Sequence, residues 1–229
     1  MRLAFSVLNE IEVALEPSGI RLRGFVRFKQ GEGPVLPDGR AASTVVLLGN
    51  IGGSIWTPFS AWRSDQPDGG GDHPLDGWSK AMILPIAERF GAGTWFPSDP
   101  PYMPFQSWAR IAEGLEASPL GILIHPEFGL WHGYRGALGF VDEFETEDTP
   151  LRSSPCNECA DKPCLHSCPV GAVNDSGFEV HSCRSHLRSG EGQGGCMAVG
   201  CLARNACPVG AEYRYPPEQL RFHMDALSL

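Results

Sequence analysis

The stretch CNECADKPCLHSCP, residues 156–169, holds four of the eight cysteines in this 229-residue chain. The other four follow at positions 183, 196, 201 and 207, and the first 155 residues contain none. The pentapeptide CPVGA occurs twice, once from Cys168 and once from Cys207. This repetition predicts two related thiolate sites in the last third of the chain.

The first four cysteines resemble the cluster-binding motif of bacterial two-cluster ferredoxins, which has two residues rather than four between its second and third cysteines. Each iron of a 4Fe–4S cube takes one thiolate, and the cysteine before proline ligates the cluster of the opposite motif. The resemblance therefore implies two 4Fe–4S clusters and no thiol left over. The first would be held by Cys156, Cys159, Cys164 and Cys207, and the second by Cys168, Cys183, Cys196 and Cys201.

Structural zinc is the main alternative, because four-cysteine zinc sites are common. Zinc ribbons usually show paired C-x2-C knuckles, however, and this chain has one such pair. A disulfide framework is disfavoured, since residues 1–15 carry Glu10 and Glu12 and show no basic-then-apolar leader. We therefore expect a cytoplasmic, reducing location.

The composition predicts a folded body without membrane spans. Hydrophobic residues make up 42% of the chain, and no apolar run approaches the roughly 20 residues that cross a bilayer. The net charge is −9, and residues 1–150 account for −8 of it, with 11 basic and 19 acidic side chains. Because phosphate backbones are bound by basic patches, we expect a nucleic-acid partner to be unlikely.

Hydrophobic periodicity predicts a mixed body before the cysteines. We expect helices over 3–15, 75–90, 105–115 and 217–227, and strands over 20–28, 44–48, 94–96, 120–125 and 134–141. Gly24 is a candidate bulge, and Pro85 should bend or split its helix. The segment 49–53 should form a loop that can approach a ligand closely. Five of the seven residues in 142–148 are acidic, which is typical of a solvated linker. We therefore predict an α+β domain over 1–148 and a cluster domain over 149–229.

The cysteine module, residues 156–211, resembles the two-cluster domain of epoxyqueuosine reductase and of reductive dehalogenases. In the former, a lone cysteine in an R-C-I-S-Y-like segment precedes a C-x2-C pair. Here the segment HSCRSHL around Cys183 takes that place, and the later pair is stretched to Cys196-x4-Cys201. The stretch leaves the number of ligands intact and puts the geometry of the second cluster in doubt.

A second resemblance lies in HPEFGLWHGYRG, residues 125–136. It is similar to the segment of CblC-type cobalamin-processing proteins that begins H-P-x-[FY]-G-G-W and ends R-G. The chain departs at Leu130, where that family has a second glycine. CblC-type proteins share a flavin-reductase, nitroreductase-like α+β fold with the corrinoid domains of epoxyqueuosine reductase and the dehalogenases. The resemblance thus implies an antiparallel-sheet domain of that class followed by a ferredoxin-like module.

Together the two resemblances imply an iron–sulfur oxidoreductase that passes single electrons to cobalamin or a similar cofactor or substrate. The alternative is a ferredoxin-like carrier whose first domain only docks partners. An electron-donor protein and a small-molecule or corrinoid ligand are the expected partners. The residues expected to bind the cofactor are His125, Gly129, Trp131, Tyr134 and Arg135. Two of them have plainer explanations, since His125 is also suited to capping a turn and Trp131 to a place in the core.

Overall fold

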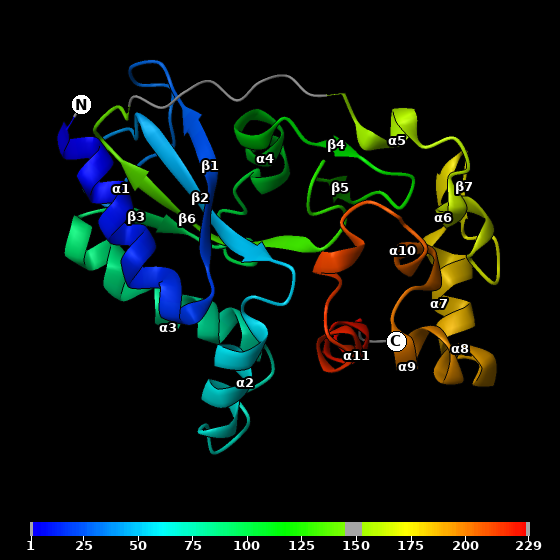
Figure 1. The fold of residues 1–229 in the computed structure, drawn as a ribbon. Helices are drawn as coiled ribbons and strands as arrows, with labels where there is room; N and C mark the ends of the chain where they lie inside the picture. Colours follow the sequence, from blue (N-terminus) through cyan, green and yellow to red (C-terminus); the bar gives the residue numbers. More distant parts are fainter. Residues whose placement is uncertain (1, 145–152, 228–229) are drawn as a thin grey trace. The chain divides into compact units, whose positions relative to one another are not determined.

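The structure divides into two compact units. The chain passes from unit 1 into unit 2, back into unit 1, and then into unit 2 again. The computed structural model describes residues 2–144 and 153–227, with side chains from residue 6 onward. Unit 1 comprises Met1–Gly114 and Gly133–Leu151, and unit 2 comprises Leu115–His132 and Arg152–Leu229 (Figure 1). The predicted boundary between residues 148 and 149 lies outside the described residues, so the division into domains 1–148 and 149–229 stays a prediction.

Unit 1 is built on a four-stranded sheet with the strand order β1-β2-β6-β3, in which β1 pairs antiparallel with β2 and β3 antiparallel with β6. Helices α1 and α3 pack against each other, and α4 packs on β1 (Figure 1). The elements are α1 (Arg2–Leu15), η1 (Glu16–Ser18), β1 (Arg21–Arg27), β2 (Thr44–Ile51), α2 (Trp56–Ser64), α3 (Pro74–Phe90), β3 (Gly93–Trp95), α4 (Phe105–Glu113) and β6 (His132–Phe140).

The central strand β2 forms because its residues are suited to burial on both faces. Every residue from Thr44 to Asn50 is buried, as a continuous β-branched and apolar run predicts. The predicted bulge at Gly24 is confirmed, since the register with β2 shifts between Leu22 and Gly24. Gly24 has φ +124°, and a β-carbon there would press on Ala112 of α4. The bulge therefore lets α4 lie close to β1.

Helices α1, α3 and α4 follow their predicted positions, and α2 was not predicted. Helix α4 buries Phe105, Trp108, Ala109 and Ala112, the one-sided spacing of a helix packed on a sheet. Helix α3 begins at Pro74, ends at a left-handed Gly91 and runs through Pro85 without splitting. The buried side chains of Ile83 and Ala87 flank that proline and keep both halves on one face.

Two predicted segments turn out differently. The predicted loop over 49–53 is wrong in its first half, because β2 continues to Ile51. A β-carbon on Gly49 would overlap the carbonyl oxygen of Gly133, so this glycine allows two strands to approach rather than a ligand. The predicted strand over 120–125 shrinks to β5 (Leu123–Ile124), which pairs with β4 (Glu116–Ala117) inside unit 2.

A buried ion pair joins β1 to α4 in unit 1. Arg23 Nη2 lies 2.7 Å from Glu113 Oε2, with side chains only 2% and 8% exposed. The same guanidinium donates from Nη1 to the Asn50 carbonyl at 2.8 Å and lies over the Tyr134 ring. Burial raises the pKa of Glu113, and Arg23 opposes that shift. The pair therefore stabilises the fold only while both charges are present.

Replacing Glu113 by glutamine should destabilise the protein by about 3 kcal/mol, because it leaves the Arg23 charge buried without its counter-ion. Urea denaturation measures this change. The matched control is Glu10→Gln, which breaks the exposed pair with Arg89 and should cost less than about 1 kcal/mol. The double variant Arg23→Met, Glu113→Leu should recover most of the lost stability. Equal losses in Glu113→Gln and Glu10→Gln would contradict this account.

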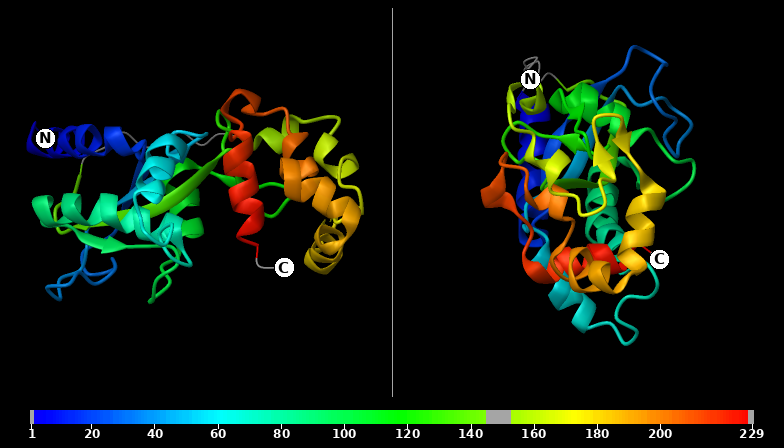
Figure 2. Two further views of the ribbon diagram at one scale, coloured as in Figure 1. Left: turned by 90° about the horizontal axis from the view of Figure 1, so that it is seen from below. Right: turned by 90° about the vertical axis from the view of Figure 1, so that its right-hand side faces the viewer.

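Unit 2 consists of short helices joined by loops, with two small hairpins (Figure 2). Helix α8 packs between α7 and α9, α9 packs on α11, and α10 packs on α6. Besides β4 and β5, the elements are α5 (Pro155–Glu158), α6 (Pro163–His166), β7 (Val173–Asn174), β8 (Gly177–Phe178), α7 (Val180–Arg188), α8 (Gly190–Gly194), α9 (Cys196–Val199), α10 (Leu202–Asn205), η2 (Ala211–Tyr213) and α11 (Pro217–Asp225).

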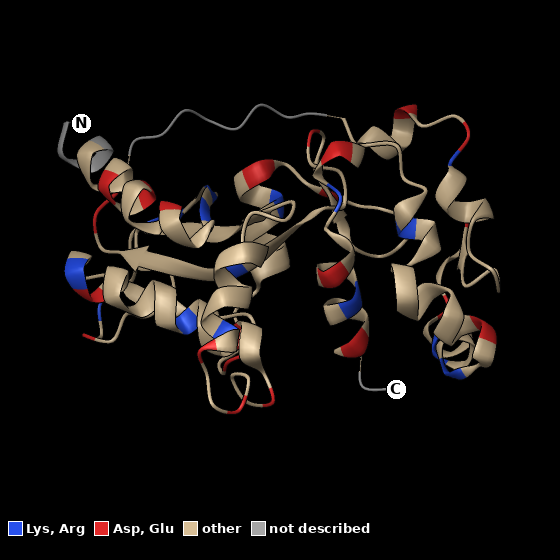
Figure 3. Cartoon of the chain, turned by 60° about the horizontal axis from the view of Figure 1, so that its bottom comes forward, with Lys and Arg blue, Asp and Glu red and all other residues tan. Residues whose placement is uncertain are grey.

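Acidic residues gather on the loop between α2 and α3, which contains Asp65, Asp68 and Asp72 (Figure 3). Within residues 2–144 and 153–227, no helix combines the length and the apolar character needed to cross a bilayer.

Candidate metal centre

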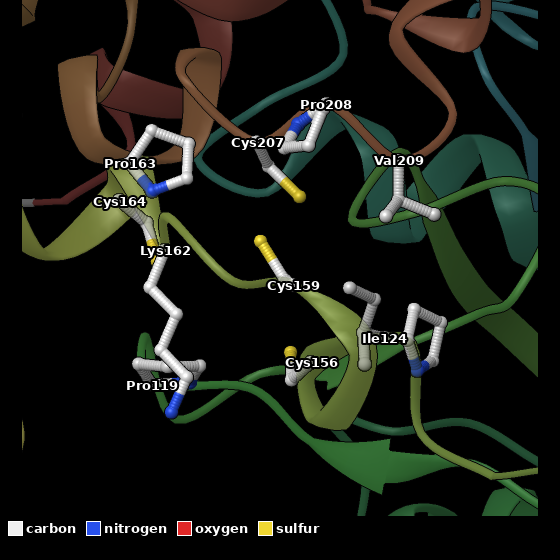
Figure 4. Close-up of a pocket in the computed structure, with 11 residues that line it drawn as sticks. Pro119, Ile124, Cys156, Cys159, Lys162, Pro163, Cys164, Cys207, Pro208 and Val209 are labelled. Carbon is white, nitrogen blue, oxygen red and sulfur yellow. The ribbon is translucent and has the colours of Figure 1, made fainter.

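Four cysteines from three parts of the sequence line one pocket in unit 2. Cys156 lies on α5, Cys159 ends that helix, Cys164 lies on α6 and Cys207 comes from beyond α10. Figure 4 shows these side chains around a common space. These are the four cysteines that the spacing assigned to one cluster. The other residues of the wall are mostly apolar: Pro119, Ile124, Pro155, Lys162, Pro163, Pro208 and Val209.

Burial and mutual repulsion govern the ionisation of this first set of thiols. Burial raises the pKa of Cys156, Cys164 and Cys207, and neighbouring cysteines of the set raise each of them further. Backbone N–H groups have the opposite effect: that of Leu165 lowers the pKa of Cys164, and that of Val209 lowers the pKa of Cys207. Such a group of thiols keeps its protons until a cation takes their place, and the N–H donors are suited to stabilising thiolate sulfur.

The second set of cysteines is held by the helices that follow. Burial raises the pKa of Cys183 on α7, and the nearby Cys201, Cys168 and Cys196 raise it further. Burial also raises the pKa of Cys201, which the backbone N–H groups of Arg204 and Ala203 counteract. Cys168 Sγ accepts a hydrogen bond from the Ala172 amide at 3.2 Å. The cysteines that influence one another here are the four that the spacing assigned to the second cluster.

The two sets meet in one hydrophobic core. Cys164 of the first set packs with Val173 and Ala203, and Cys168 and Cys201 of the second set pack against the same group. The glycines of the two CPVGA repeats have similar backbone angles, since Gly171 has φ +62° and Gly210 has φ +66°. The repeat predicted from the sequence is therefore a structural repeat at its glycines, and the two thiol sets are neighbours.

The first thiol set has the donor chemistry of a soft-metal or iron–sulfur site. Its four thiols line a mostly apolar pocket, and backbone N–H groups act on Cys164 and Cys207. Thiolates are the ligands of iron–sulfur clusters and of many structural zinc sites. Among the residues that the structure describes, no group of three or more His, Cys, Asp or Glu is gathered closely enough to hold one metal ion.

The segment Leu115–His132 forms part of this unit and supports Cys207. Ile124 and Leu130 are each 2% exposed and pack with Cys207, Cys156 and Val209. Gly129 has φ +58°, and a β-carbon there would overlap the carbonyl oxygen of Val209. A β-carbon on Gly210 would in turn overlap the backbone of Phe128. The two glycines thus let the loop and the CPVGA backbone touch directly.

Two of the residues expected to bind a cofactor make structural contacts in this loop. His125 Nδ1 accepts hydrogen bonds from the amides of Glu127 and Phe128 at 3.0 and 3.1 Å, and its ring stacks on Phe128. Trp131 is fully buried and packs on Tyr215 and Leu220. The Arg204 guanidinium lies 4.4 Å from the Trp131 ring and donates to the Leu130 carbonyl. These are the turn and core roles that the sequence left open.

The remaining two predicted residues lie on β6 in unit 1. Tyr134 and Arg135 are both half-buried near the start of the strand. Burial and the neighbouring Glu113 carboxyl raise the pKa of Tyr134 well above its usual range, so the hydroxyl keeps its proton. The structure therefore divides the HPEFGLWHGYRG segment, with His125, Gly129 and Trp131 in unit 2 and Tyr134 and Arg135 in unit 1.

Several residues of the site were not predicted from the sequence. Pro119 and Ile124 line the thiol pocket from a segment that lies 32 or more residues before the first cysteine. The backbone of Arg204 contacts both thiol sets. Its N–H lowers the pKa of Cys201, and its carbonyl accepts a hydrogen bond from the Cys207 amide at 3.2 Å. The apolar residues in 120–124 indicate that this segment is buried. They do not indicate that it packs with Cys207.

No protein-family model matches this chain, and no curated protein matches it in sequence. Among solved structures it is similar to epoxyqueuosine reductase from Streptococcus thermophilus, with a TM-score of 0.53 and 15% identity over 91% of this chain and 67% of that one. It is also similar to an epoxyqueuosine reductase solved with a tRNA-Tyr stem loop (TM-score 0.53, 14% identity, 95% and 71% covered). The CblC B12-trafficking protein of C. elegans gives the same TM-score with 11% identity, and the match covers 96% of this chain and 92% of that one.

These similarities show the fold: a mixed α/β chain with an antiparallel sheet, like that of epoxyqueuosine reductase and CblC. They agree with both resemblances noted in the sequence. The expectation that nucleic acid is an unlikely partner receives no support, because one neighbour was solved with a tRNA stem loop.

Proposed function

We propose that this protein is an iron–sulfur oxidoreductase. Two 4Fe–4S clusters in unit 2 would supply single electrons to a corrinoid, or to a similar flat cofactor or substrate, held with the help of unit 1. The first cluster would be held by Cys156, Cys159, Cys164 and Cys207. The second would be held by Cys168, Cys183, Cys196 and Cys201. The alternative is a ferredoxin-like carrier in which unit 1 only docks a partner protein.

The observation that carries the proposal is the pocket lined by Cys156, Cys159, Cys164 and Cys207. Its members come from three segments, and the motif spacing assigned the same four to one cluster. Backbone N–H groups reach sulfur in both sets, and hydrogen bonds to sulfur are a main determinant of cluster potential. Because the two sets share one core, an electron would have only a short distance to travel between them.

Unit 1 would contribute the groups that bind the acceptor. Arg135 is a fixed cation whose planar head can bind a carboxylate or another anionic side chain through two parallel hydrogen bonds. Tyr134 stays protonated because of its burial, and so it can donate a hydrogen bond at any physiological pH. The loop that ends at Trp131 continues directly into β6, and chain connectivity therefore links the support of Cys207 to these two residues.

The deciding experiment is metal and sulfide analysis of protein purified without oxygen, followed by titration with cob(II)alamin. The proposal predicts about eight irons and eight acid-labile sulfides per chain, since two cubes hold four of each. It also predicts a shift of the corrinoid absorbance spectrum on binding. Full iron loading with no spectral shift would favour the electron carrier. Stoichiometric zinc without iron would overturn both versions.

Arg135→Ala should weaken corrinoid binding about tenfold while leaving the iron content unchanged, because it removes one charge-assisted contact worth about 1.4 kcal/mol. The titration above measures both quantities on one sample. Arg89→Ala is the matched control, since Arg89 is exposed on α3 and pairs with Glu10 at the surface. Loss of iron in Arg135→Ala would make the residue structural, and equal weakening by Arg89→Ala would remove its specific role.

The similarity to epoxyqueuosine reductase favours a tRNA substrate as a second candidate. The acidic balance of residues 1–150 speaks against it, because it offers few cations for phosphate. A gel-shift experiment with a tRNA anticodon stem loop distinguishes a tRNA substrate from a corrinoid or similar small acceptor. Binding that weakens steeply with salt would support the tRNA substrate.

A further inference from the structure

The two residues that lengthen the first cysteine motif place a lysine at the thiol pocket. Where the bacterial motif has two residues, this chain has Ala160, Asp161, Lys162 and Pro163 between its second and third cysteines. Lys162 lines the pocket formed by the first thiol set, and it is the one charged residue among those lining this pocket. Figure 4 shows its side chain extending along the pocket towards Pro119.

The backbone at Lys162 is held in an unfavourable conformation. It has φ +36° and ψ +58°, in the left-handed region, and it immediately precedes Pro163. Among the described residues other than glycine, only Tyr102 shares a positive φ. A residue before proline normally adopts an extended conformation, and a side chain in the left-handed region costs about 1–2 kcal/mol. A lysine kept at a position that favours glycine is an outlier of the kind found at functional sites.

We propose that Lys162 raises the reduction potential of the first cluster, the one held by Cys156, Cys159, Cys164 and Cys207. This inference rests on the proposed function, since it requires the cluster. Reduction adds one electron to the cluster and places one more negative charge in the pocket. A cation at the wall stabilises that charge, so the reduced state becomes more populated at a given solution potential.

The test is a dithionite titration of the anaerobic holoprotein, followed by electron paramagnetic resonance. Lys162→Gln should lower the equilibrium constant for reduction of one cluster about fivefold, which is about 40 mV towards negative potential for a one-electron couple. Lys162→Arg, which keeps the charge, should stay within about twofold of the wild type. The shift in Lys162→Gln should shrink as ionic strength rises, because the side chain is exposed to solvent.

Lys162→Gly distinguishes the effect of the lysine charge from the effect of the left-handed backbone at this position. Glycine relieves the left-handed conformation, so this variant should fold at least as well as the wild type and should still show the same fivefold shift. Arg221→Gln is the matched control, because it removes an exposed cation from α11 in the same unit, away from the pocket. It should leave both potentials unchanged.

Three results would overturn the inference: an unchanged potential in Lys162→Gln, a wild-type potential in Lys162→Gly, or an equal shift in Arg221→Gln. Each requires protein that carries its full iron. A sample without iron would instead refute the proposed function, so the two failures are distinguishable. Iron content measured on every variant decides which of them has occurred.

Discussion

Changing Cys207 to serine should remove about half of the iron from anaerobically prepared protein and leave the second cluster intact. Cys207 completes the first thiol set, and a cube that lacks one of its four thiolates is held poorly. Cys183→Ser should remove the other half, because Cys183 belongs with Cys168, Cys196 and Cys201. Iron analysis and electron paramagnetic resonance of the reduced protein measure both losses.

Double variants make the assignment of ligands testable. The pair Cys156→Ser, Cys207→Ser lies within one set and should lose no more iron than Cys207→Ser alone. The pair Cys156→Ser, Cys183→Ser affects both sets and should lose nearly all of it. Equal iron losses in the two double variants would mean that the cysteines are not divided in this way, and the proposed assignment of ligands to clusters would be wrong.

Gly210→Ala should destabilise unit 2 by about 2–5 kcal/mol and reduce the occupancy of the first cluster. A side chain at φ +66° costs about 1–2 kcal/mol, and here the added carbon would also overlap the backbone of Phe128 and Gly129. That backbone is fixed by its own contacts with Cys207 through Leu130, so neither segment can move without a loss of packing. Urea denaturation and iron analysis measure the two effects.

The internal repeat supplies the control. Gly171 occupies the same place in the first CPVGA repeat and has nearly the same φ, yet a β-carbon there would meet no atom within 4 Å. Gly171→Ala should therefore show only the conformational cost of about 1–2 kcal/mol. Similar losses in the two variants would show that the contact between Gly210 and the loop adds nothing to stability.

Ligand chemistry allowed a division of the cysteines into two sets to be predicted from the sequence. The number of thiolates per cube and the cysteine-proline rule restrict how eight cysteines can divide, and the structure places Cys156, Cys159, Cys164 and Cys207 around one pocket. Local patterns likewise predicted the bulge at Gly24 and the amphipathic helix α4, because each depends on residues close together in the chain. Such features depend little on tertiary context.

Long-range packing decided the parts that the sequence did not predict. Apolar runs indicate that a segment is buried without naming its partners, and for this reason the pairing of Leu123–Ile124 with Glu116–Ala117 was not predicted. Gly49 illustrates the same problem, since a glycine that admits a ligand and one that admits a neighbouring strand look alike in sequence. The Arg23–Glu113 pair, 90 positions apart, left no local signal at all.

Because unit 2 is built from two separate parts of the sequence, it cannot be isolated as one continuous fragment. A fragment that begins after residue 148 would contain every cysteine but would lack Pro119 and Ile124, which line the thiol pocket, and Leu130, which packs with Cys207. The cysteine-containing portion is thus not a self-contained part that a single cut could transfer. Grafting it onto another scaffold would require the strand-and-loop insert of residues 115–132 to be transplanted as well.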